Sequence, residues 1–350
     1  MNAMRRMAGA GVVAAAALFA SMGHAQQSDW DLDSAFEALA SYTGGDDRTA
    51  LDFLQERVSA ASTTFTLKRD LEARFLSLIQ QPGVNTAARD FALSQLHRVA
   101  TDRCVQVLEP LLYNADTSEM SRIALEKVPV DTATDALIKA MQKTKGSIQA
   151  GIIYSLGERR DSRAAEPITK YSGKGESEVV RAAIWALGEI GGPIAEDDLR
   201  WCRGNTLREH RDFAAMALIR VADRYAEDGD IASALGLYDL LFIRAEPPEV
   251  RALALQGLLR TDSGSAVDTV IEILRTDEPE VQQAALRAVR ELPGADITKH
   301  FAAALPGLPV EIQGQLMLAL AERGDPAALP AIHAMLRSGN AGTRYAAIEA

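Results

Sequence analysis

The side chains that usually carry enzyme chemistry are present but scattered. After residue 25 the chain has four histidines, and none of them begins an HExxH pattern or is followed directly by a glutamate. A metal site needs several ligands that converge on one point, and these spacings bring none together. The chain also has no GxSxG and no Walker motif. The residues therefore predict no catalytic residue, no metal ligand and no cofactor, and we expect the chain not to be an enzyme.

The composition is that of a helical globular protein with an acidic surface. The 350 residues are 47% apolar and 24% charged, which is enough for a large core. Only 5% are aromatic and alanine is abundant, which favours close-packed helices over sheets. With 37 Lys and Arg against 48 Asp and Glu, the net charge is −11. We expect no nucleic-acid partner, because such a partner requires a basic face.

The first 25 residues have the pattern of a signal peptide. Arg5 and Arg6 precede a small-residue apolar run from Ala8 to Ala20, and a small-residue cleavage site ends at Ala25. The run is shorter than the roughly 20 residues of a membrane-spanning helix, and no later run is long enough. We therefore expect cleavage after Ala25, no membrane span, and a periplasmic or secreted protein.

A repeat of 31 residues organises most of the sequence. Segments similar to EVVRAAIWALGEIGG, which starts at Glu178, recur from Ala87 to the end of the sequence. Aligned on the residue after the leading Glu or its equivalent, five of eight spacings are 31 residues and one is 40. The aligned residues are Ala88, Met120, Ile148, Val179, His210, Val250, Val281, Ile312 and Thr343. A fixed period of this size is typical of solenoid proteins.

Each copy has the pattern of a helix. Four residues after the aligned residue, seven of nine copies have Ala, and eight residues after it every complete copy has an aliphatic residue. These positions share one side of a helix, and Ala there allows a neighbouring helix to approach closely. Gly157 and Gly188 are expected to mark helix ends. A second apolar pattern lies between the copies, so each repeat is predicted to be a helix pair.

The predicted fold is all-α, a right-handed α-solenoid of stacked helix pairs over residues 85–350 with an incomplete last repeat. Residues 26–84 are expected to form an irregular helical capping segment. The spacing of 40 is expected to lengthen the first helix of its repeat and the adjoining loop. Cys104 and Cys202 fall in different repeats, so we expect two free, buried thiols. Because the last copy stops at Ala350, before its aliphatic position, we expect either an N-terminal portion of a longer chain or a truncated gene product.

The runs VVRAAIWALGEIGG and VQQAALRAVREL, from Val179 and Val281, resemble HEAT repeats of the short bacterial type. The stretch from Met120 to Pro167 also resembles exported bacterial HEAT-repeat proteins, in which repeats often precede a catalytic or carbohydrate-active domain. Two enzyme classes built from HEAT-like repeats are compared with this chain. Deoxyhypusine hydroxylases bind iron through paired His-Glu motifs, which this chain lacks. Phycobilin lyases have cytoplasmic partners, whereas this chain is expected to be exported.

A stripe on the second helices is the candidate binding site. Six residues after the aligned residue, three consecutive repeats have Tyr154, Trp185 and Met216. In the HEAT architecture the second helices line the concave surface, so these side chains are expected to form a patch about 20 Å long there. Arg181 and Asp212 are expected to flank it. An apolar stripe with charged edges is typical of a protein or carbohydrate contact. The alternative is that this face packs against the other helix layer or a terminal segment.

The leading hypothesis is an exported, non-enzymatic scaffold whose concave face binds a protein or a polysaccharide. The first alternative is an accessory or docking module of a larger exported enzyme, carbohydrate-active for example, with its catalytic domain beyond Ala350. A third hypothesis, a lyase-like HEAT enzyme, requires a buried polar cluster or a bound chromophore.

Overall fold

The computed structural model describes residues 30–45, 47–262, 266–292 and 294–350. The predicted signal peptide, residues 1–25, lies outside the described residues. The chain divides into two compact units, which we call unit 1 and unit 2. Unit 1 comprises the chain up to Leu108 and Ile123–Pro129, and unit 2 comprises Glu109–Arg122 and Val130–Ala350. The proposed boundary between a capping segment 26–84 and repeats 85–350 stays a prediction.

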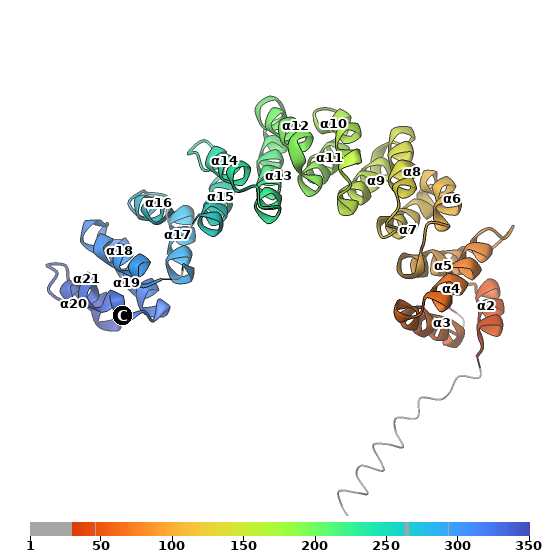
Figure 1. Ribbon diagram of the computed structural model, residues 1–350, viewed down its shortest axis with the longest axis horizontal. Helices are drawn as coiled ribbons and strands as arrows, with labels where there is room; N and C mark the ends of the chain where they lie inside the picture. The colour runs from red at the N-terminus through yellow and green to blue at the C-terminus, as the bar shows by residue number, and fades with distance from the viewer. Residues whose placement is uncertain (1–29, 46, 263–265, 293) are drawn as a thin grey trace, which may run out of the picture. The chain divides into compact units, whose positions relative to one another are not determined.

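Every regular element in the described part of the chain is a helix (Figure 1). None of the helices described is long and apolar enough to span a membrane. In unit 1, Phe75 is fully buried, with its ring centroid 4.9 Å from that of Phe36 and 6.4 Å from that of Phe91. The helices of unit 1 are α2 (Leu32–Ser41), α3 (Thr49–Ala60), η1 (Ala61–Thr63), α4 (Phe65–Ile79), α5 (Thr86–Val99) and α6 (Cys104–Leu108). The residues of α7 (Ala115–Glu126) divide between the two units.

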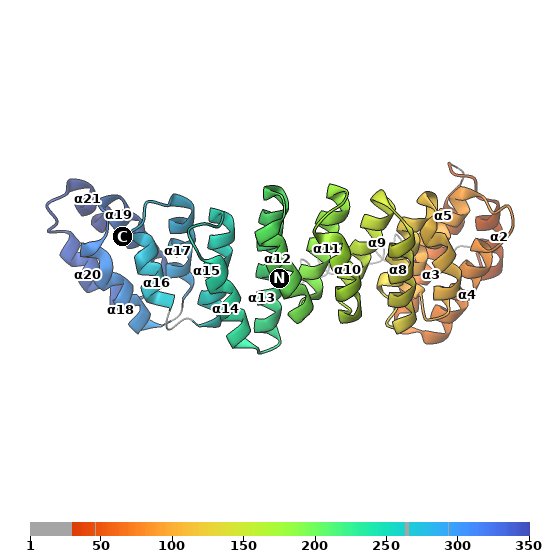
Figure 2. The same cartoon turned by 90° about the horizontal axis from the view of Figure 1, so that it is seen from above.

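Unit 2 is an α-solenoid of helix pairs, and successive pairs lie side by side (Figure 2). Each second helix packs against the second helix of the next pair. The first-helix layer is η2 (Glu109–Tyr113), α8 (Asp131–Lys143), η3 (Ser162–Ala164), α10 (Ala165–Ser172), α12 (Gly192–Asn205), α14 (Ile231–Leu241), α16 (Ala266–Leu274), α18 (Ala295–Ala304), η4 (Leu305–Gly307), η5 (Pro326–Ala328) and α20 (Leu329–Met335). The second-helix layer is α9 (Gly146–Arg159), α11 (Ser177–Ile190), α13 (Arg208–Glu227), α15 (Pro248–Thr261), α17 (Pro279–Glu291), α19 (Val310–Arg323) and α21 (Ala341–Glu349).

The repeated positions are buried as the sequence predicts. The residue four places after each aligned residue, usually Ala, is buried in all nine copies. The aliphatic residue eight places after it is buried in all complete copies but one. The exception is Leu258, which is half-buried beside the buried Leu259. The 31-residue period therefore corresponds to one helix pair, with its core along one side of the second helix.

The expectation that Gly157 and Gly188 end their helices is wrong, because both lie inside α9 and α11. A Cβ on Gly157 would lie 2.8 Å from the Cα of Ala186 on α11. A Cβ on Gly188 would lie 3.0 Å from the Cβ of Ala217 on α13. Glycine at these positions allows neighbouring second helices to pack closely. The helices end instead at backbone with positive φ, Arg160 after α9 and Gly191 after α11.

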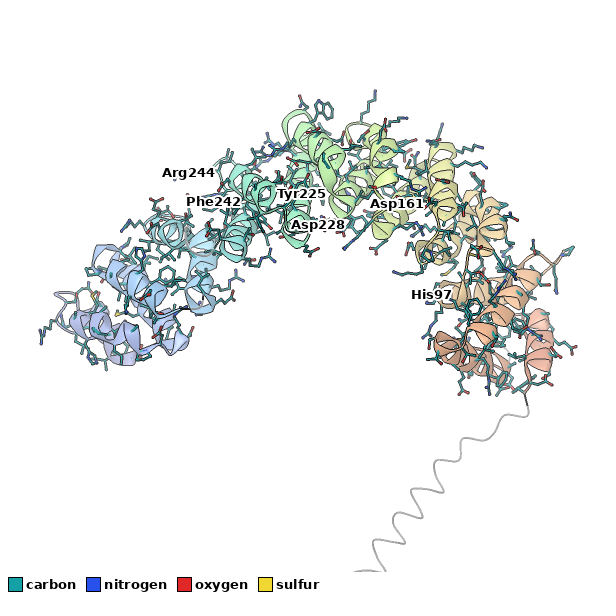
Figure 3. The ribbon with its side chains drawn as sticks, in the orientation of Figure 1. His97, Asp161, Tyr225, Asp228, Phe242 and Arg244 are labelled. Carbon is teal, nitrogen blue, oxygen red and sulfur yellow. The ribbon has the colours of Figure 1, made fainter. Side chains whose placement is uncertain are left out.

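The expectation that the 40-residue spacing lengthens the first helix of its repeat is also wrong. The extra residues lengthen α13, which has 20 residues where α9, α11, α15 and α19 have 14 each, and α14 has only 11. Val221 and Ala222 on the added turns are fully buried, and this burial favours continuing the helix. The same turns carry Tyr225, which is labelled in Figure 3. Its hydroxyl donates to Oε2 of Glu196 on α12 at 2.9 Å.

The two cysteines are free and buried, as predicted. Burial raises the pKa of Cys104 and that of Cys202 to about 12 in each case. Both thiols are therefore protonated at neutral pH, and a protonated thiol is a poor nucleophile and metal ligand.

A polar cluster joins the first helix of one repeat to the start of the next. At the end of α9, Arg159 Nε donates to Oγ1 of Thr134 on α8 at 3.0 Å. Thr134 Oγ1 donates in turn to Oδ2 of Asp161, at 2.7 Å. Asp161, labelled in Figure 3, also caps η3 by accepting from the backbone N–H of Arg163 at 3.1 Å. Three side chains thus fix the loop that leads into the next pair.

The same cluster recurs with identical sequence spacing at the end of α19. Arg323 Nε donates to Thr298 Oγ1 at 2.6 Å, and Thr298 Oγ1 donates to Asp325 Oδ2 at 2.6 Å. Asp325 caps η5 through the backbone N–H of Ala327 at 3.0 Å. Because the two copies share residue types, spacing and bonds, the cluster is a feature of the repeat.

We expect Asp161→Asn to destabilise unit 2 at neutral pH and to reduce its sensitivity to acid. The hydrogen bond from the Arg163 side chain, with that from Thr134, holds the pKa of Asp161 well below its usual value. A carboxyl whose pKa is lowered by folding contributes stability above its unfolded pKa of about 3.9, and this contribution is lost as the pH falls towards the folded pKa.

Urea denaturation at pH 7 and at pH 3 measures the effect. The difference in midpoint between wild type and Asp161→Asn should shrink at the lower pH. Asp135→Asn, which removes a 65% exposed carboxylate 3.3 Å from the same Arg163, is the control. An Asp161→Asn protein with the same loss of stability at both pH values would contradict this role for the carboxylate.

Candidate functional site

Three successive second helices of unit 2 form a hollow of about 290 Å³. We call it the aromatic hollow, because three of its seven lining side chains are aromatic. It lies over the stretch in which α9, α11 and α13 pack directly on one another. Its lining residues are Tyr154 from α9, Arg181, Ile184 and Trp185 from α11, and Phe213, Met216 and Arg220 from α13.

The position of Trp185 is fixed from two sides. Its ring centroid lies 5.1 Å from that of Tyr154, with an angle of 57° between the planes. A tilted pair at this separation is a favourable aromatic arrangement. A Cβ on Gly157 would lie only 2.6 Å from Cζ3 of Trp185, so the indole covers the glycine on α9. The Trp185 side chain on α11 therefore packs against Tyr154 and Gly157 on α9.

Two guanidinium groups border the aromatic hollow. The Cζ of Arg181 lies 5.6 Å from the ring centroid of Phe213, which is within the range of a cation–π contact. Its Nη1 is 3.9 Å from Oε1 of Glu209. The Nε of Arg220 is 3.3 Å from Oε1 of Glu189. The two arginine side chains are 45% and 40% exposed, so each has N–H donors available to a ligand.

The structure brings together four of the five residues predicted from the sequence. Tyr154, Trp185 and Met216 are half-buried and Arg181 is exposed, and all four line the aromatic hollow. Asp212 does not line it. Asp212 borders two neighbouring hollows, one of which includes Met216. The predicted stripe is therefore one continuous hollow, with Asp212 beside it.

Three lining residues were not predicted from the sequence as part of the site: Ile184, Phe213 and Arg220. Phe213 and Arg220 lie on α13. Together with Met216 they are spaced by three and four residues along α13, which places them on one face of that helix. This spacing is the sequence signal that identifies them once Met216 is chosen. The lining contains no carboxylate, thiol or imidazole, so the hollow offers mainly apolar contact and hydrogen-bond donation, with the Tyr154 hydroxyl as its one side-chain oxygen.

A metal centre has no support within the part of the chain that the structure describes. No group of three or more His, Cys, Asp or Glu side chains in that part is arranged to hold an ion.

Comparison with known families gives a match to HEAT repeats in two segments, residues 134–219 and 236–307. These two segments of the chain are similar to HEAT repeats. The first matched segment runs from α8 into α13, and it includes every residue of the aromatic hollow except Arg220. The candidate site is thus built on HEAT repeats.

Solved structures similar to this chain include two HEAT-like enzymes. Human deoxyhypusine hydroxylase in complex with glycerol has 17% identity and a TM-score of 0.35, with 71% of this chain and 94% of the other covered. The complex of CpcE and CpcF of phycocyanin lyase from Nostoc sp. PCC7120 has 14% identity and a TM-score of 0.35, with 65% and 92% covered. A search of curated protein sequences finds no match to this chain.

These structures correct one expectation from the sequence. The chain was expected not to be an enzyme, but two of the solved proteins that resemble it are a hydroxylase and a lyase. The expectation that the chain is not an enzyme therefore does not stand. At this level of similarity the two proteins also assign no reaction to the chain.

Proposed function

We propose that the chain is an exported HEAT-repeat protein that binds a protein partner through the aromatic hollow. The observation that carries this proposal is the convergence of Tyr154, Trp185, Phe213 and Met216 from three helices on one surface hollow. Aromatic residues, Met and Arg are the types enriched in protein interfaces, and large side chains seated in a pocket supply most of the binding energy.

The chemistry of the hollow favours a protein over a polysaccharide. Sugar hydroxyls need acceptors as well as donors, and the Tyr154 hydroxyl is the one side-chain oxygen in the lining, which has no carboxylate and no amide side chain. The Trp185 indole packs on Gly157 and Tyr154, and the Arg181 guanidinium lies over the ring of Phe213, which is 44% exposed, so part of each ring surface is already in contact with the protein. The proposal of export rests on the residue pattern of the first 25 positions.

We expect Trp185→Ala to weaken partner binding by at least about 30-fold, the effect of losing an interface hot spot of about 2 kcal/mol. The cost in stability should stay below the about 3–5 kcal/mol of a fully buried tryptophan, because Trp185 is half-buried. The purified chain is used to capture partners from the periplasmic and secreted fractions of the organism. Affinity for the captured partner is then measured by calorimetry, and stability by thermal denaturation.

Leu318→Ala is the matched control. Leu318 occupies the same repeat position on α19 and is 50% exposed. Its truncation should leave partner binding unchanged. Equal binding by wild type and Trp185→Ala would reject the hollow as the binding site. A partner found only in a cytoplasmic extract would argue against export.

A further inference from the structure

The aromatic hollow continues into two further hollows on unit 2. A hollow of about 210 Å³ shares Phe213 and Met216 with it and extends to Pro247 and Val250 at the start of α15. A larger one of about 860 Å³ shares Asp212, Pro247 and Glu249 with the second. Through these shared walls the three form one groove, which runs from the second-helix layer to the loops that precede α13 and α15.

Arginines gather at both ends of this groove. At one end Arg181 and Arg220 border the aromatic hollow, whose lining includes no carboxylate. At the other end the largest hollow is lined by four arginines, Arg200, Arg203, Arg208 and Arg211, and by three carboxylates, Asp212, Glu246 and Glu249. The middle hollow is lined by the apolar side chains of Phe213, Met216, Pro247 and Val250, and by Asp212 and Glu249.

The arginines of the largest hollow differ in how they are paired. The Nε of Arg203 is 2.6 Å from Oε1 of Glu246, and the Nε of Arg200 is 2.8 Å from Oε1 of Glu196. Arg208 and Arg211 are exposed, and in the described part of the chain they form no ion pair. Both side chains can therefore donate to a ligand without breaking an internal salt bridge.

We propose that the groove binds an extended acidic segment of the protein partner, with a large apolar side chain in the aromatic hollow. Carboxylates of the segment form ion pairs with Arg181 and Arg220 at one end of the groove and with Arg208 and Arg211 at the other. This inference rests on the proposed function, and it adds the chemistry of the partner. Guanidinium groups suit the task, since their planar N–H donors match a carboxylate in two parallel hydrogen bonds.

Charge complementarity favours an acidic occupant over a basic one. The chain carries a net charge of −11, so carboxylates are available to a basic segment over much of the protein surface. A basic segment would therefore have little electrostatic preference for this groove. The three hollows are lined by six arginines and three carboxylates, so the groove is net positive on an acidic chain, and an acidic segment is attracted there and repelled elsewhere. Successive helices lie about 8–10 Å apart, so crossing from α9 to α15 takes roughly 8 extended residues at about 3.3 Å each.

The test is selection from a displayed library of random peptides of about 12 residues, slightly longer than the groove requires. Selection is run in parallel on the full chain and on its Trp185→Ala variant. One peptide enriched by the wild type alone is synthesised, and its Kd is measured by fluorescence anisotropy. The variants are the double changes Arg181→Gln with Arg220→Gln, and Arg208→Gln with Arg211→Gln. Arg287→Gln on α17, an exposed arginine at the same repeat position as Trp185, is the control.

The enriched peptides should be rich in Asp and Glu next to a Trp, Phe or Leu. Each double variant should raise the Kd at least about tenfold, which corresponds to 1.4 kcal/mol, while Arg287→Gln changes it less than about threefold. Peptides that depend on Trp185 but are neutral or basic and insensitive to the arginines would overturn the acidic partner and leave the proposed function intact. Identical peptides from wild type and Trp185→Ala, or none from either, would overturn both.

Discussion

Gly257→Ala is expected to lower the free energy of unfolding of unit 2 by about 2 kcal/mol, because the added methyl group overpacks a buried site. An alanine Cβ at this position would lie 2.2 Å from Cε1 and 2.3 Å from Cζ of Tyr238. These separations are far below van der Waals contact. The gain in helix propensity from Gly to Ala is only about 1 kcal/mol, so steric overlap decides the sign.

Tyr238 cannot move aside easily. Its side chain is fully buried, and its hydroxyl donates to Oδ1 of Asp223 at 2.7 Å. The same oxygen accepts from Nη2 of Arg260 at 2.6 Å. The ring is therefore held by packing along its length and by hydrogen bonding at its tip. Accommodating the methyl group requires α14 and α15 to separate or the Tyr238–Asp223 bond to break.

Gly236→Ala on α14 is the matched control for this prediction. Gly236 is also inside a helix, and its Cβ would meet no atom within 4 Å. The substitution should therefore raise the free energy of unfolding by up to about 1 kcal/mol, through helix propensity alone. Urea denaturation followed by circular dichroism compares the two variants. If Gly257→Ala were as stable as Gly236→Ala, the Tyr238 ring would not be the constraint described here.

Gly157 and Gly257 show which features of the fold are predictable from the sequence and which are not. The buried alanines and aliphatic residues recur every 31 residues, and their burial depends on which side of their own helix they occupy. The role of a glycine inside a helix depends instead on what the neighbouring helix presents. For Gly157 that is Trp185, and for Gly257 it is Tyr238. No local pattern distinguishes such a glycine from one that ends a helix.

The candidate site was predictable to the extent that it follows the repeat. Tyr154, Trp185 and Met216 hold equivalent positions, so stacking the repeats brings them together. Phe213 has no such signal, because the equivalent residues on α9 and α11 are Gly151 and Ala182. Asp212 lines two other hollows, together with Pro247 before α15 and Glu249 at the start of α15. The loop before α15 lies within the 40-residue interval, where the repeat is irregular and the sequence alone does not place it.

Glu72→Ala is expected to destabilise unit 1 by about 3 kcal/mol, because it leaves two hydrogen-bond donors without their acceptors. Glu72 lies on α4 and has no exposed surface. Its Oε1 accepts from the backbone N–H of Thr101 at 2.5 Å, and its Oε2 accepts from Thr101 Oγ1 at 2.7 Å. The carboxylate thereby fixes the turn that leads into α6, where helix geometry alone supplies no partner for that N–H group.

Three variants separate this role from the loss of a charge. Glu56→Ala removes an exposed carboxylate from α3 and should change the urea midpoint little. Glu72→Gln keeps one acceptor for the backbone N–H and should cost less than Glu72→Ala. Thr101→Val removes the hydroxyl donor, so its effect and that of Glu72→Ala should be less than additive in the double variant. Full additivity would mean that the two side chains stabilise unit 1 independently, and that the buried carboxylate does not act through Thr101.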